Sequence, residues 1–202
     1  MSTEIRKYEL KARAESQRET REQIARAAAQ LHEEKGVAAT TVAEIARRAG
    51  VSRLTVYNHF ADLDQLIPAC AAHYETRHPL PDFAAALAEE EPGERVGATL
   101  SLLYGWYRET EPMFGKLFSD RSSVPELDRF MAANIDRVQA ELAAELAAPF
   151  GARGQAAARL GAMLRVALDF WTWRRLTGEG LTEAAAADLM AAAVAATAPP
   201  PR

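Results

Sequence analysis

The stretch TTVAEIARRAGVSRLTVYNHF, residues Thr40–Phe60, decides the fold. Thr41 and Glu44 have the spacing of a capping box, in which each side chain bonds a backbone N–H at the start of a helix. Gly50 ends that helix, because glycine adopts a positive φ at little cost. Ser52 is a good N-cap for a second helix that follows directly. The stretch therefore predicts two short helices joined by a tight turn.

Small and apolar residues inside this stretch indicate that its helices form a helix-turn-helix. Ala46 allows the helices to touch, Gly50 provides the turn four residues later, and Val56 packs the second helix onto the first. An ordinary helical hairpin with solvated arginines and threonines is the alternative. The coincidence of cap, small residue, glycine and buried valine favours the helix-turn-helix. Its small core is completed by Ile45, Ala49 and Val51.

The exposed residues of this motif suit contact with DNA. The second helix of a helix-turn-helix lies in the major groove, where Arg53 can bind guanine O6 and N7 and Thr55 can reach a base edge or a thymine methyl. We expect the remaining hydroxyl, amide, imidazole and guanidinium groups to meet phosphates. The predicted DNA-binding residues are Thr40, Thr41, Arg48, Ser52, Arg53, Leu54, Thr55, Tyr57, Asn58 and His59.

These residues resemble the DNA-binding domain of TetR-family transcriptional regulators over about residues 18–78. The matching positions are Thr41, Ile45, Ala46, Ala49, Gly50, Val51, Ser52, Thr55, Tyr57, His59, Phe60 and Leu66. The resemblance implies a homodimeric repressor that binds a palindromic operator in double-stranded DNA and is released by a small-molecule effector. It also implies a three-helix DNA-binding domain followed by a helical ligand-binding and dimerisation domain.

Two positions depart from the family pattern. Leu54 stands where the family usually has glycine, so its side chain either packs against the turn or faces the groove and contacts thymine methyl groups. Leu63 stands where the family usually has lysine, which removes an expected phosphate contact. These departures motivate a second hypothesis, a helical small-molecule-binding or scaffold protein with a weakened DNA reader.

Working outward, the whole chain predicts an all-α fold of about nine helices. Of 202 residues, 43 are alanine, the best helix former, and no strand alternation is present. We expect a flexible charged arm at residues 1–17, the DNA-binding domain at 18–78 with its motif at about 41–60, and a C-terminal domain at 79–202. The expected helices are 18–35, 41–49, 53–59, 62–74, 83–90, 95–110, 113–118, 124–147, 155–176 and 182–196.

Composition and charge exclude several other classes of protein. A net charge of −4 argues against a general polyanion binder, although Thr40–Phe60 carries three arginines and one glutamate. The one cysteine, Cys70, excludes an intramolecular disulfide framework and is expected to be a buried small hydrophobe in a cytoplasmic protein. No apolar run is long enough to span a membrane. No catalytic constellation, cofactor motif or metal-ligand spacing is present, so we expect neither an enzyme nor a bound cofactor.

The C-terminal part predicts a dimer interface and a ligand pocket. By the family resemblance, helices within about residues 155–196 pair with their copies in a homodimer. An aromatic- and methionine-rich cluster predicts a pocket for a largely apolar or aromatic effector, with Tyr104, Asn134 and Arg165 as polar candidates, although such clusters also serve as plain core. The predicted lining residues are Leu103, Tyr104, Tyr107, Met113, Phe114, Phe118, Met131, Asn134, Ile135, Met163, Phe170 and Trp171.

Overall fold

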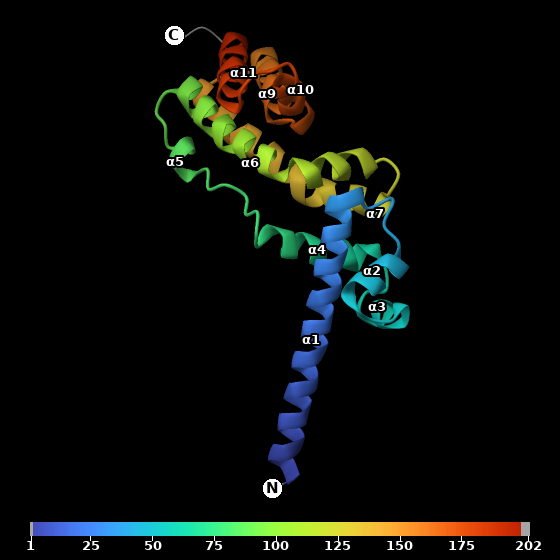
Figure 1. The fold of residues 1–202 in the computed structure, drawn as a ribbon. Coiled ribbons are helices and arrows are strands. Elements are labelled where there is room, and N and C mark those ends of the chain that lie inside the picture. The colour runs from blue at the N-terminus through green and yellow to red at the C-terminus, as the bar shows by residue number, and fades with distance from the viewer. Residues whose placement is uncertain (1, 199–202) are drawn as a thin grey trace. The chain divides into compact units, whose positions relative to one another are not determined.

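The structure is a computed structural model that describes the backbone of residues 2–198 and the side chains of residues 7–198. Over these residues the chain is helical and has no strand, which confirms the all-α prediction (Figure 1). It divides into two compact units. The N-terminal unit comprises Met1–Pro79 and Pro112–Met131, and the C-terminal unit comprises Leu80–Glu111 and Ala132–Arg202.

The N-terminal unit contains the predicted helix-turn-helix. Its helices are α1 (Ser2–Lys35), α2 (Val42–Ala49), α3 (Arg53–His59), α4 (Leu63–Glu75), the end of α6 (Pro92–Asp120) and α7 (Pro125–Met131). Both expected caps are confirmed: Thr41 and Glu44 form the capping box of α2, and Ser52 accepts a hydrogen bond from the Thr55 N–H at the start of α3.

Apolar side chains from α1 to α4 share one core in this unit. Val56 is 1% exposed, Phe60 2% and Ile24 0%, so the valine and phenylalanine at either end of the last turn of α3 are sealed inside. Leu63 packs partly buried against this core, in keeping with its leucine side chain. The other members are Ala25, Ala28, Ala29, Leu31, Ile45, Ala46, Leu66 and Cys70. Burial raises the pKa of the Cys70 thiol to about 12.

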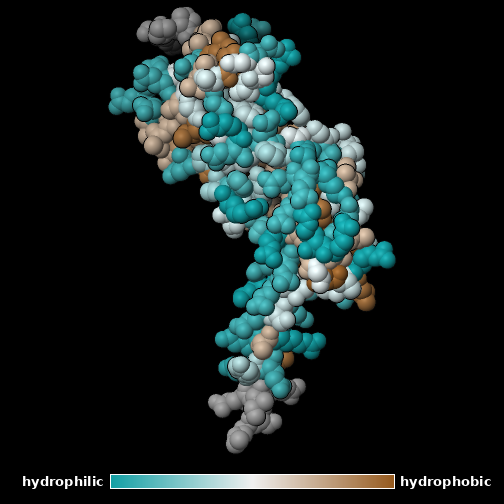
Figure 2. Space-filling view, in the orientation of Figure 1, coloured by the Kyte–Doolittle hydropathy of each residue, from teal (hydrophilic) through white to brown (hydrophobic). Residues whose placement is uncertain are grey.

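Helix α1 is longer than expected. We expected residues 1–17 to form a flexible arm, but α1 begins at Ser2 and continues without interruption to Lys35. The reason lies in the composition, because this segment holds no proline or glycine and is rich in glutamate, lysine, arginine and alanine, which favour helix. Figure 1 shows this first half extending beyond α2, α3 and α4, and the part of it that is coloured in Figure 2 has a mostly hydrophilic surface.

Two further helix boundaries differ from expectation. Pro112 was expected to end a helix, yet α6 continues through it, since a proline interrupts one backbone hydrogen bond but leaves good helix formers on either side. Conversely, the helix expected over 155–176 breaks at Asp169. That residue is extended, and its carboxylate accepts hydrogen bonds from the N–H groups of Trp171 and Thr172, which starts a new helix.

The C-terminal unit is built from α5, the first part of α6 and the helices that follow α7. Apolar residues of α6, α9 and α10 are fully buried, among them Leu100, Leu160 and Phe170. No helix over the described residues is both long and apolar enough to cross a membrane. The elements are α5 (Ala84–Leu87), the π-helical turn η1 (Ala132–Asp136), α8 (Arg137–Ala147), the short η2 (Ala148–Phe150), α9 (Gly154–Leu168), α10 (Phe170–Gly178) and α11 (Glu183–Thr197).

Two buried tyrosines form hydrogen bonds with the backbone carbonyl groups that lose their helical partners at the break at Asp169. The Tyr104 hydroxyl donates to the carbonyl oxygen of Ala167 and the Tyr107 hydroxyl to that of Leu168, both at 2.7 Å. Gln139 Nε2 donates to the Leu168 carbonyl oxygen as well, at 3.1 Å. Last-turn carbonyls of a helix have no partner within the helix, so these bonds stabilise the end of α9. Burial raises the pKa of both tyrosines.

The turn between α1 and α2 is closed by a carboxylate from the end of α6. Asp120 Oδ2 accepts a hydrogen bond from the Ala38 N–H at 3.0 Å. Gly36 has a φ of 88°, and a Cβ at this position would collide with the Asp120 carboxylate. His32 is buried one turn earlier in α1. Burial lowers the pKa of His32 to about 4, and the charge of Asp120 raises it only in part.

Replacing Phe60 with alanine tests the core. We expect Phe60→Ala to lower the free energy of unfolding by about 3–5 kcal/mol, because it leaves a cavity where a fully buried ring stood. Urea denaturation followed by far-ultraviolet circular dichroism measures the loss. Leu54→Ala, at a side chain that is 69% exposed, is the matched control and should change stability by less than about 0.5 kcal/mol. Equal effects of the two substitutions would contradict this packing.

His32 predicts a pH dependence of stability. In the folded protein the pKa of His32 is about 4, below its ordinary value of 6.5. Between these two pH values His32 is therefore protonated in the unfolded chain and neutral in the folded one. Above pH 6.5 the titration of His32 does not lower the free energy of unfolding. On acidification to pH 4 it lowers that free energy by about 3 kcal/mol. Thermal melting across this range should show a flatter profile for His32→Gln than for the wild type, and parallel profiles would contradict the assignment.

Candidate nucleic-acid interface

The turn between α2 and α3 is fixed by backbone hydrogen bonds. Gly50 ends α2 with φ 68°, and the Val51 N–H donates to the Ala46 carbonyl oxygen at 2.9 Å. This pattern satisfies last-turn carbonyls of α2 and requires the left-handed conformation that glycine adopts most readily. A Cβ at Gly50 would meet nothing within 4 Å, so backbone conformation and not space selects glycine here.

The hydroxyl groups at the start of α3 bond each other. Ser52 Oγ lies 2.8 Å from Thr55 Oγ1 and accepts the Thr55 N–H at 3.0 Å. Both residues were predicted to bind DNA. In the free protein they stabilise the first turn of α3, so their first role is to shape the helix.

Four other predicted residues of α3 present their side chains to solvent. Leu54 is 69% exposed and Tyr57 53%, and Arg53 and Asn58 are also exposed. Among the side chains that the structure describes, Arg53, Tyr57 and Asn58 have no hydrogen-bond or ion-pair partner. In Figure 2, hydrophobic surface is visible at the outer edge of the region formed by α2 and α3. These side chains are therefore available to an external partner without breaking an existing contact.

The predicted threonines before α2 use their hydroxyls within the protein. Thr40 Oγ1 donates to the Gly36 carbonyl oxygen at 2.6 Å, and Thr41 Oγ1 donates to Glu44 Oε2 at 2.7 Å. Lys35 Nζ lies 2.6 Å from Glu44 Oε1. The Lys35 ammonium and the Thr41 groups lower the pKa of Glu44 to about 2. A phosphate at this helix start would have to compete with Glu44 for the Thr41 hydroxyl.

The two arginines at the end of α2 differ in their partners. Arg48, which we predicted to neutralise a phosphate, forms a two-pronged ion pair with Glu34 of α1 at 2.7 and 2.8 Å. Arg47 is exposed, and no partner for it occurs among the described side chains. The sequence prediction named Arg48 and not Arg47; which of the two faces Glu34 depends on how α1 and α2 pack. Arg47 therefore joins the candidate phosphate contacts.

Arg21 of α1 holds the end of α3. Its guanidinium donates to the carbonyl oxygen of His59, the last residue of α3, and its Cζ lies 3.9 Å from the centre of the Phe60 ring. A cation at a helix C-terminus is favourable for the helix dipole. No local sequence pattern predicts this role, because Arg21 lies 38 residues before His59.

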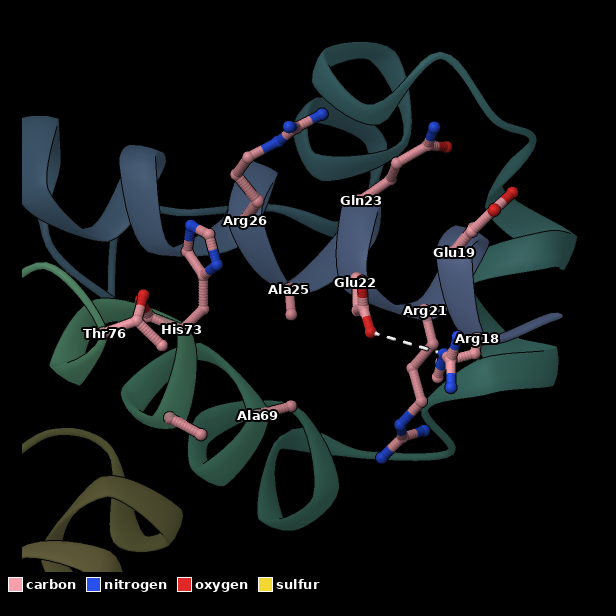
Figure 3. Close-up of a pocket in the computed structure, with 11 residues that line it drawn as sticks. Arg18, Glu19, Arg21, Glu22, Gln23, Ala25, Arg26, Ala69, His73 and Thr76 are labelled. Atoms are coloured by element: carbon pink, nitrogen blue, oxygen red, sulfur yellow. Dashed lines mark hydrogen bonds and ion pairs between the residues drawn. The ribbon is translucent and has the colours of Figure 1, made fainter. Parts of the chain in front are cut away.

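A groove of about 700 Å³ lies between α1 and α4 in the same unit. Figure 3 shows Arg18, Arg21 and Arg26 around it, interleaved with Glu19 and Glu22, and an ion pair of 3.8 Å joins Arg18 to Glu22. None of the predicted effector-binding residues lines this groove. Among the described residues, no group of three or more His, Cys, Asp or Glu side chains is arranged to hold a metal ion.

The predicted effector-binding residues are divided between the two units. Met113, Phe114, Phe118 and Met131 belong to the N-terminal unit, and the others belong to the C-terminal unit. In the latter, Tyr107, Phe170 and Trp173 pack as a ring cluster with centroids 5.4–5.7 Å apart. Asn134 and Trp171 are exposed, Ile135 and Met163 are half-buried, and Leu103 and Tyr104 are buried.

Comparison with known proteins agrees with this geometry. Residues 24–70 match the sequence model described as bacterial regulatory proteins, tetR family. The transcriptional regulator TtgR of Pseudomonas putida is 39% identical over 95 residues, which are 47% of this chain and 44% of TtgR. The regulator BetI of Burkholderia mallei is 29% identical over 168 residues, covering 78% of this chain and 82% of BetI.

The fold of this chain is also similar to that of a solved structure. The crystal structure of a tetR-family transcriptional regulator from Streptomyces coelicolor superposes with a TM-score of 0.61 at 21% identity, covering 89% of this chain and 80% of that one. Residues 24–70 thus match the tetR-family model, and the fold over most of the chain is similar to that of a tetR-family structure. The match of this chain to TtgR spans less than half the length of that relative.

Arg21 provides a test of how α3 is held. We expect Arg21→Ala to lower the free energy of unfolding by about 1 kcal/mol, through loss of the contacts to Phe60 and to the end of α3. Arg18→Ala is the matched control on the same helix, because its exposed ion pair contributes less than about 0.5 kcal/mol. Chemical denaturation of both variants measures the difference. A loss no larger for Arg21→Ala than for Arg18→Ala would contradict the role of Arg21.

Proposed function

We propose that this protein is a sequence-specific DNA-binding transcriptional regulator of the cytoplasm, most simply a homodimeric repressor that an effector releases from a palindromic operator. The observation that carries the proposal is the exposed surface of α3. Arg53, Tyr57 and Asn58 project from a helix whose opposite side is sealed into the core by Val56. The family match over residues 24–70 and the regulator names of the relatives support the same function.

In this proposal α3 enters the major groove. Arg53 bonds guanine O6 and N7 in a two-pronged contact, which distinguishes guanine from the other bases. Tyr57, Asn58, His59 and Arg47 contact phosphates or sugar groups and set the position of the helix on the duplex. The local excess of positive charge over Thr40–Phe60 favours this approach to a polyanion, even though the whole chain is acidic.

Dimerisation through α9 and α11 is part of the same proposal. These helices pack against each other and leave small or apolar side chains exposed at helical spacing: Ala185, Leu189, Ala192 and Ala196 on α11, and Ala158, Ala162 and Val166 on α9. Leu189 is 49% exposed and Val166 48%. Small side chains allow close approach of helices, and a two-fold dimer matches the symmetry of a palindrome.

An apolar or aromatic effector in the C-terminal part completes the proposal. The buried rings of Tyr107, Phe170 and Trp173 would supply the apolar wall of such a site, and Trp173 Nε1 is buried with no hydrogen-bond partner among the described atoms. A buried donor of this kind favours a ligand that brings an acceptor. In the N-terminal unit, Arg129 of α7 forms a two-pronged ion pair with Asp64 at the start of α4, a contact through which a shift of α7 would displace the reader.

Arg53 tests the proposed function. On a duplex selected by the wild-type protein, we expect Arg53→Ala to cost about 1–3 kcal/mol and to relax the preference at one base pair of each half-site. Fluorescence anisotropy against a panel of single-base-pair variants, repeated over a range of salt concentrations, measures both effects. Binding should fall steeply with salt, as it does for a protein with several phosphate contacts.

Arg53→Lys is the matched control, because it keeps the charge and loses the two-pronged geometry. It should restore general affinity without restoring the base preference. Uniform losses on every duplex for Arg53→Ala would instead make Arg53 a phosphate contact. Folded wild-type protein that shows no salt-dependent binding to any duplex would overturn the proposed function and favour a helical binding or scaffold protein.

A further inference from the structure

An exposed apolar side chain stands on the helix proposed to read DNA. Leu54, the second residue of α3, is 69% exposed, and Tyr57 is 53% exposed three residues further along, on the same side of the helix. Val56 between them is 1% exposed. The core of the unit is therefore complete without Leu54, and burial within the protein does not account for a leucine at this position.

The turn before α3 does not use this leucine either. The sequence left open whether Leu54 packs against the turn or faces outward, and its exposure answers in favour of the outward orientation. Val51 and Ala49 cover the turn, because both pack against the core. Leu54 thus leaves an apolar surface that is accessible to an external partner.

The neighbouring groups point to DNA as that partner. Arg53 adjoins Leu54, and Thr40–Phe60 carries three arginines and one glutamate. The glutamate is engaged by Lys35 and Thr41, and Arg48 by Glu34. Arg47 and Arg53 are therefore the exposed arginines of this stretch without a partner among the described side chains. This surface complements a polyanion. The exposed large apolar side chains of α3 are Leu54 and Tyr57, and two such side chains are few for the apolar core of a stable protein interface, which buries about 800 Å² from each partner.

The major groove offers one apolar group to such a side chain. All four bases present hydrogen-bonding groups there, but only thymine also presents a methyl group, on C5. We propose, building on the function proposed above, that Leu54 is a specificity-determining residue that selects thymine at one position of each half-site by packing against its C5-methyl group. Arg53 then reads an adjacent base by hydrogen bonds and Leu54 reads this one by apolar contact.

Replacing thymine by uracil isolates this contact, because deoxyuridine lacks only the methyl group. Each thymine of a selected duplex is replaced in turn, and the dissociation constant is measured by fluorescence anisotropy at fixed salt. For the wild type we expect one position per half-site at which uracil weakens binding about fourfold, the effect of one methyl group removed from apolar contact. For Leu54→Ala the thymine and uracil duplexes should bind equally at that position.

Two controls keep the test specific. Leu54→Met keeps an apolar side chain and should retain part of the discrimination, while Arg53→Ala should weaken binding but leave the thymine-to-uracil ratio unchanged. Denaturation curves of the Leu54 variants should superpose on that of the wild type, since the side chain is exposed.

The outcomes separate this inference from the proposed function. A selected duplex that tolerates uracil at every thymine, or that contains no thymine, overturns the role of Leu54 and leaves the DNA-binding function in place. Undiminished discrimination in Leu54→Ala overturns it as well. A folded protein that selects no duplex overturns the proposed function itself, and this inference with it.

Discussion

The burial of Val56 and Phe60 against α1 and α2 is the interaction on which the N-terminal unit depends. These two residues flank the last turn of α3, and both are almost completely buried. Because they fix one side of a seven-residue helix, they also determine which side chains remain outside. An isolated helix of this length is not stable in water, so its conformation comes from this packing. The exposure of Arg53, Leu54, Tyr57 and Asn58 is a consequence of that constraint.

Polar contacts around α2 and α3 then decide which charged groups stay available. Glu34 occupies Arg48, Glu44 occupies Lys35 and the Thr41 hydroxyl, and the Arg21 guanidinium rests on Phe60. Each of these contacts strengthens the scaffold and withdraws a group from any partner. Of the ten residues that the sequence indicates, Thr40, Thr41 and Arg48 thus have side-chain partners within the protein. Among the described side chains of this stretch, Arg47 and Arg53 are the arginines without a partner.

Sequence reasoning succeeded where local chemistry determines the structure. The capping box at Thr41, the left-handed Gly50 and the Ser52 cap each act within a few residues, and all are present as expected. It failed where distant contacts decide. The break at Asp169 is supported by Tyr104 and Tyr107, more than sixty residues earlier, whose hydroxyls bond the carbonyls released at the end of α9. The pairing of Arg48 and the contacts of Arg21 depend in the same way on which helices meet.

Sequencing the fragments that the purified protein retains from sheared genomic DNA of its source tests most directly whether α3 reads sequence. We expect enrichment of an inverted repeat whose half-sites are centred about 34–36 Å apart, one turn of B-DNA, or a multiple of that distance. Such a site requires two copies of the chain, each with its α3 in a major groove. Fragments that show no common sequence, retained by protein that is folded and dimeric, would contradict sequence-specific recognition by this surface.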